Sequence, residues 1–83
     1  MVQFTLVGRQ VEADGGEVVR AMAKVAPRPI RRYFMEIDGT RYPAKQVLER
    51  LLEVKGIALY AADVTSRDAN RILRKLGFEV MAI

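Results

Sequence analysis

The sequence predicts an α+β fold, a two-layer sandwich in which three helices cover one face of a small antiparallel or mixed sheet. Three observations predict it. Residues 4–11 and 34–42 both have the pattern of a strand, a glycine turn and a short second strand, each followed by apolar residues at helical spacing. Residues 65–80 add a third helical pattern that ends in a short apolar strand. The 83 residues, 51% of them hydrophobic, suit a single α+β domain, residues 1–83.

The first predicted element is a β-hairpin. Residues 2–7 alternate as a half-buried strand should: Val2, Phe4 and Leu6 lie on the face that we expect to be buried, and residues 3, 5 and 7 lie on the other face. Residues 8–9 supply a tight turn, and residues 10–13 return as a short second strand.

A helix is expected to follow this hairpin. Asp14 has a glutamate three residues later, the spacing of a capping box, so the helix should run from about residue 15 to 25. Its apolar stripe consists of Val18, Val19, Met22, Val25 and Ala26. We expect Pro27 and Pro29 to end the helix, because proline lacks the amide hydrogen that a helix interior needs.

A basic, proline-stiffened connector, residues 26–32, leads to the second hairpin. Residues 33–37 alternate as a strand should, and residues 41–42 form the short return strand. Asp38 and Gly39 between them predict a two-residue turn, because both tolerate the positive φ that such a turn requires.

The second helix should begin at Pro43. Proline suits the first helical position because an N–H there would have no partner within the helix, so its absence costs nothing. Its apolar face consists of Ala44, Val47, Leu48, Leu51 and Val54. Gly56 should close it. Residues 57–64 are apolar and fit a buried loop, a short helix or a strand equally well.

The third helix is the element with the clearest pattern. Thr65, with Asp68 three residues later, predicts its N-cap, and Gly77 predicts its end. The buried face should contain Ala69, Ile72, Leu73 and Leu76. Residues 78–83 then form the closing strand.

Basic residues gather in two segments of the chain. On the third helix, Arg67, Arg71 and Arg74 have the spacing i, i+4, i+7 of a single stripe, with Asn70 and Lys75 beside them. The connector adds Arg28, Arg31 and Arg32. Fourteen basic against ten acidic residues give a net charge of +4, which favours polyanionic partners. These eight residues form the candidate nucleic-acid-binding site.

The composition points away from catalysis. Histidine and cysteine are absent, which removes the usual zinc ligands and the commonest general base. Glu49 and Glu53 have the spacing of a chelating pair, but a solvated helix face explains them better. We therefore expect no enzyme activity, no metal and no cofactor. No apolar run approaches the ~20 residues of a membrane span, so we expect no membrane partner and a cytoplasmic location.

Two resemblances accompany these patterns. The segments EIDGTRYPAKQVL (36–48) and TSRDANRILRKLGFEV (65–80) together resemble a small prokaryotic, actinobacterial-type domain that sometimes stands alone and sometimes lies beside restriction-type nucleases. This resemblance implies a nucleic-acid-directed accessory module without an activity of its own. The phrase RILRKLGFEV (71–80) is similar to the helix–strand step of the HicA toxins, ribonucleases with a double-stranded-RNA-binding-like fold. Their catalytic histidine has no counterpart in this chain, so their activity is not carried over.

The leading hypothesis is a nucleic-acid-binding module, with DNA preferred over RNA because aromatic residues are few. The alternative is a non-catalytic interaction module that forms a homodimer through the strand at residues 78–83. A third interpretation makes the basic stripe a merely solvated helix face, its cations paired with acids such as Glu49, Glu53 or Glu79. Replacing Arg71 and Arg74 by glutamate is expected to abolish nucleic-acid binding without changing thermal unfolding.

Overall fold

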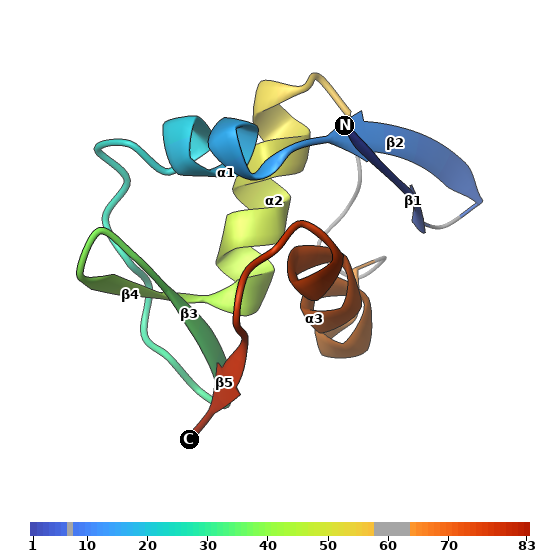
Figure 1. Ribbon diagram of the computed structural model, residues 1–83. Helices are drawn as coiled ribbons and strands as arrows, with labels where there is room; N and C mark the ends of the chain where they lie inside the picture. The colour runs from blue at the N-terminus through green and yellow to red at the C-terminus, as the bar shows by residue number, and fades with distance from the viewer. Residues whose placement is uncertain (7, 58–63) are drawn as a thin grey trace.

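The computed structural model describes residues 1–6, 8–57 and 64–83, and its elements follow the predicted order of hairpin, helix, hairpin, helix, helix and strand (Figure 1). The elements are β1 (Val2–Leu6), β2 (Arg9–Ala13), α1 (Gly15–Ala21), β3 (Tyr33–Ile37), β4 (Thr40–Pro43), α2 (Ala44–Val54), α3 (Ser66–Lys75) and β5 (Met81–Ala82). The α+β class is confirmed. Of the uncertain segment 57–64, residues 58–63 lie outside the described residues. None of the described helices is long and apolar enough to cross a membrane.

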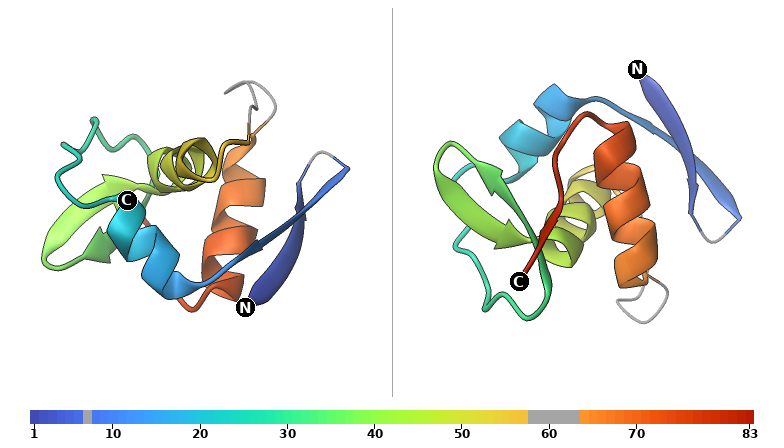
Figure 2. Two further views of the ribbon diagram at one scale, coloured as in Figure 1. Left: turned by 90° about the horizontal axis from the view of Figure 1, so that it is seen from above. Right: turned by 60° about the horizontal axis from the view of Figure 1, so that its bottom comes forward.

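The five described strands form two antiparallel sheets, where the sequence suggested one. β1 pairs with β2, and β3 lies between β4 and β5 in a separate three-stranded sheet. Both edges of β3 are therefore occupied, while the first hairpin packs against α3 instead. Figures 1 and 2 show the two sheets on opposite sides of α2 and α3.

The core lies where α2 and α3 pack together between the sheets. Val47 and Leu48 of α2 and Leu73 of α3 are completely buried, and Met35 of β3 joins them. Most of the predicted apolar face of α2 is confirmed, but Val54 is 57% exposed. Leu52 is buried in its place, since the stripe 44, 47–48, 51–52 follows the helical period more closely.

Both predicted N-caps are confirmed. The Asp14 carboxylate accepts a hydrogen bond from the Glu17 amide at 2.8 Å, and the Thr65 hydroxyl accepts one from the Asp68 amide at 3.1 Å. These contacts satisfy amides that a helix start leaves without partners. The start of α3, and with it the direction of its basic stripe, is therefore determined locally.

The predicted length of α1 was wrong, because the helix ends at Ala21 and not near Val25. The guanidinium of Arg50 donates to the carbonyl of Ala21 at 3.2 Å, and the hydroxyl of Tyr42 donates to the carbonyl of Val25 at 3.1 Å. Lys24 has a φ of 63°, which turns the chain away from the helix axis. Side chains of the second half of the chain thus end α1 before the prolines are reached.

The closing strand is also shorter than predicted. Gly77, with a φ of 98°, ends α3, and the Phe78 amide donates back to the Leu73 carbonyl at 3.0 Å. This arrangement is a Schellman motif, and it uses the residues that would have begun the strand. Only Met81–Ala82 pairs with β3, so the edge available to a second copy is short.

Candidate functional site

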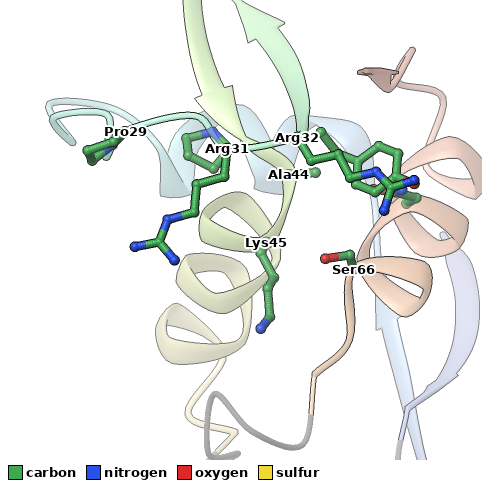
Figure 3. Close-up of a pocket in the computed structure, with 9 residues that line it drawn as sticks. Pro29, Arg31, Arg32, Ala44, Lys45 and Ser66 are labelled. Atoms are coloured by element: carbon green, nitrogen blue, oxygen red, sulfur yellow. The ribbon is translucent and has the colours of Figure 1, made fainter. Parts of the chain in front are cut away.

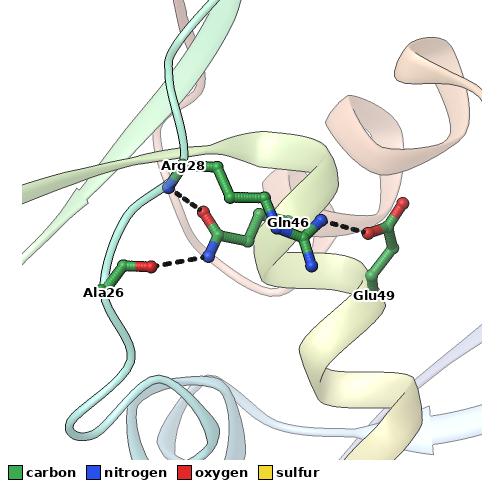
Figure 4. Close-up of polar contacts among 4 residues, drawn as sticks. All are labelled: Ala26, Arg28, Gln46 and Glu49. Atoms are coloured by element: carbon green, nitrogen blue, oxygen red, sulfur yellow. Dashed lines mark hydrogen bonds and ion pairs between the residues drawn. The ribbon is translucent and has the colours of Figure 1, made fainter.

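Gln46, in the first turn of α2, determines where the basic connector lies. Its side chain is 5% exposed and bonds the connector backbone twice (Figure 4). The amide nitrogen donates to the Ala26 carbonyl at 2.9 Å, and the amide oxygen accepts from the Arg28 backbone amide at 2.9 Å. The path of the connector across the start of α2 is thus held through main-chain groups.

Arg28 does not join the other basic residues in one cluster. Its guanidinium forms an ion pair with Glu49 of α2 at 3.0 Å, and its side chain is 67% exposed (Figure 4). A carboxylate at this distance offsets most of the field that Arg28 would add. The connector therefore contributes Arg31 and Arg32, and not the predicted set of three.

A hollow of about 500 Å³ brings Arg32, the last residue of the connector, together with α3. We call it the arginine groove. Its lining residues are Arg32, Tyr33, Thr65, Ser66, Arg67, Asn70, Arg71 and Arg74. Five of the eight residues predicted from the sequence thus share one surface, and none of the described residues that line it is acidic.

The arginines of α3 are held differently from one another. Arg71 donates to the Thr5 carbonyl of β1 at 3.0 Å and lies 3.8 Å from a carboxylate oxygen of Asp68. Arg74 donates to the Val80 carbonyl at 3.4 Å. A carbonyl orients a guanidinium but leaves its positive charge, whereas Asp68 offsets part of the charge of Arg71. The other three arginines of the groove have no ion pair to a described residue, so the groove stays basic. Replacing Arg71 and Arg74 would nevertheless remove contacts within the fold, which the sequence did not indicate.

Two further cations frame the groove. The guanidinium carbon of Arg32 lies 5.0 Å from the centre of the Tyr33 ring, a cation–π contact that holds the side chain in place. Arg67 is exposed in the first turn of α3. Lys75 is exposed in the last turn but is not among the residues that line the groove.

A second hollow of about 310 Å³ adjoins the groove, where α2 and α3 begin. We call it the helix-start cavity. Its lining residues are Pro29, Arg31, Arg32, Tyr33, Pro43, Ala44, Lys45, Ser66 and Asn70. Lys45 and Ser66 were not among the predicted site residues. The available signal was a helix that begins with Pro43 and has no acidic residue in its first turn.

Asn70 lines both hollows and is 7% exposed. Among the described residues its side-chain oxygen has no hydrogen-bond partner. A buried acceptor without a partner costs about 1–3 kcal/mol. Asn70 is thus a polar side chain that the packing of the fold does not explain.

We expect Asn70→Leu to raise the free energy of unfolding by about 1 kcal/mol, because an apolar side chain with the same number and branching of heavy atoms has no unsatisfied acceptor. For a domain of this size the melting temperature should rise by about 4–8 °C. Thermal unfolding followed by circular dichroism measures the change. A lower melting temperature would show that Asn70 makes a structural hydrogen bond.

Comparison with known proteins found no matching family model, no matching curated protein and no matching solved structure. The resemblances to the actinobacterial-type domain and to the HicA toxins therefore stay predictions. The chemistry of the site comes from its own side chains: guanidinium, ammonium and hydroxyl groups that can donate hydrogen bonds to an anion.

Proposed function

We propose that this protein is a small, non-catalytic nucleic-acid-binding module that holds a DNA backbone in the arginine groove. The observation that carries the proposal is the convergence of Arg32 with the arginine stripe of α3 around one hollow without acidic lining residues in the described chain. Arginine donates in pairs to phosphate oxygens, which makes such a surface suited to a polyanion.

The spacing of the stripe supports DNA as the polymer. Arg67 and Arg74 lie about 10 Å apart along α3, since a helix rises about 1.5 Å per residue. The major groove of B-DNA is about 12 Å wide, so the two arginines can reach phosphates on both of its sides.

The aromatic residues support DNA over single-stranded RNA. RNA-binding modules commonly stack unpaired bases on exposed rings. Here Arg32 lies over Tyr33 and Arg41 lies over Phe34, while Phe4 and Tyr42 are buried. Few of the described rings are thus available for stacking.

Affinity for duplex DNA is expected to fall steeply with salt. Four arginines line the groove, and each neutralised phosphate contributes about −0.9 to the slope of log K against log salt concentration. A slope of about −3 to −4 should therefore appear in fluorescence-anisotropy titrations of a labelled duplex. Binding that is indifferent to salt, or absent at low salt, would contradict the proposed function.

Homodimerisation through the C-terminal strand stays a prediction. Its structural basis is the outer edge of β5, which has two residues, and the exposed Ile83. The groove lies within one chain, so the proposed binding does not depend on a second copy.

A further inference from the structure

We propose that the helix-start cavity binds the terminal phosphate of a DNA strand whose backbone lies in the arginine groove. This inference rests on the proposed function and adds the part of the DNA that the protein recognises, a phosphorylated strand end. The two hollows are continuous in their lining, since they share Arg32, Tyr33, Ser66 and Asn70.

The cavity has the charge that a phosphate monoester requires. Arg31, Arg32 and Lys45 line it, and no acidic residue is among its described lining. Figure 3 shows the side chains of Arg31 and Arg32 extending away from each other, with Lys45 and Ser66 below and between them. Three cations thus line a cavity that would receive a group carrying about −1.5 to −2 charges at neutral pH.

The first turn of α2 adds backbone donors. Its N-cap is Pro43, which provides no side-chain hydrogen bond, and its first turn contains no acidic residue. Gln46 cannot reach back to cap the helix, because both ends of its amide hold the connector. The first amides of this 11-residue helix thus have no side-chain cap, and the helix dipole favours negative charge there.

Asn70 supplies an independent sign of a ligand. Asn70 lines both hollows and is more than nine-tenths buried. Among the described residues its side-chain oxygen has no hydrogen-bond partner. A fully ionised phosphate has no hydrogen to donate, and this oxygen is itself closed to solvent, so it gains a partner if the amide turns toward an amino group of the terminal base. A nucleotide carries both the anion and this donor within one unit.

A strand end fits this cavity better than an internal phosphate. An internal phosphodiester is flanked by sugars on both sides and has two free oxygens, whereas a terminal monoester has one sugar and three free oxygens. The cavity lies between the first turns of two helices, and its volume of about 310 Å³ is smaller than the 500 Å³ of the groove. The wider groove beside it suits the continuing backbone.

The test compares internally labelled duplexes of one sequence that differ only at their ends: a 5′-phosphate, a 3′-phosphate or free hydroxyls. Fluorescence anisotropy at one salt concentration gives each affinity. We expect the duplex with one of the two phosphorylated ends to bind about tenfold tighter than the duplex with hydroxyl ends. The terminal phosphate would gain charge-assisted hydrogen bonds to the cations of the cavity. Preference for the 5′ or the 3′ arm supports the inference and identifies the strand end.

Two variants locate the effect. Lys45→Gln should remove the preference for the phosphorylated end and leave affinity for the hydroxyl-ended duplex within about twofold. Arg74→Gln should weaken binding to all duplexes by a similar factor, because Arg74 lines the groove and not the cavity. Melting temperatures confirm that both variants fold.

The outcomes separate the two proposals. Equal, salt-dependent affinity for all three ends would overturn the terminal-phosphate site and leave the proposed function standing. A preference that persists in folded Lys45→Gln would also overturn the assignment to this cavity. Failure of every duplex to bind at low salt would overturn the proposed function together with the inference built on it.

Discussion

Reversing two charges, Arg32→Glu with Arg67→Glu, is expected to lower the affinity for duplex DNA about 100-fold at low salt. Each change removes a cation that lines the groove and places a carboxylate there, where it repels the phosphates. Both side chains are exposed, and among the described residues neither forms a hydrogen bond or an ion pair. Arg32 loses its cation–π contact with the Tyr33 ring, which is a small change, so folding should survive. Anisotropy titrations and thermal unfolding measure the two quantities separately.

A matched control uses Arg20→Glu with Arg41→Glu. Arg41 resembles Arg32, since its guanidinium carbon lies 5.2 Å from the centre of the Phe34 ring, and Arg20 is an exposed helical arginine like Arg67. Net charge changes equally in both double variants, but the control residues line neither the groove nor the cavity. Equal loss of affinity in both variants would mean that net charge alone drives binding, against the assigned site.

Gln46→Ala should have the largest effect on stability among the polar residues of the site. The change removes two hydrogen bonds of 2.9 Å to the connector and is expected to cost about 2 kcal/mol. For 83 residues this lowers the melting temperature by about 10 °C. Affinity for DNA should change little, because the Arg32 carbonyl accepts independently from the Ile83 amide at 2.8 Å, at the start of β3.

The control for this prediction is Glu49→Ala, one turn further along α2. It removes the ion pair with Arg28, an exposed contact worth less than about 1 kcal/mol. Its melting temperature should stay within a few degrees of the wild type. If Gln46→Ala were as stable as Glu49→Ala, the connector would be held by something other than the Gln46 amide.

Local chemistry explains which parts of the fold could be predicted from the sequence. The caps at Asp14 and Thr65 and the turn at Asp38 and Gly39 depend on neighbouring residues, and all of them are confirmed. The predicted end of α1 was wrong because Arg50, 29 residues later in the chain, donates a hydrogen bond to the carbonyl of Ala21, the last residue of the helix. The division into two sheets likewise depends on which strands meet in space.

The same distinction applies to the candidate site. The stripe on α3 follows from helical spacing alone, so Arg67, Arg71 and Arg74 lie together as predicted. The course of the connector depends on two long-range contacts, from Gln46 to its first residues and from the Ile83 amide to the Arg32 carbonyl, and neither can be read from the sequence. The sequence therefore did not predict that Arg28 pairs with Glu49, away from the arginine groove. It did not predict Lys45 as a site residue either, because Lys45 lines a cavity that forms only when α2 and α3 pack side by side.

The way in which the connector is fastened has a consequence for protein engineering. Gln46 forms hydrogen bonds with the backbone carbonyl of Ala26 and the backbone amide of Arg28. Every amino acid other than proline has both of these backbone groups. Side chains at positions 31 and 32 can therefore be randomised in a library while the loop keeps its course. A small scaffold of this kind would let new ligand preferences be selected without redesigning the domain that carries them.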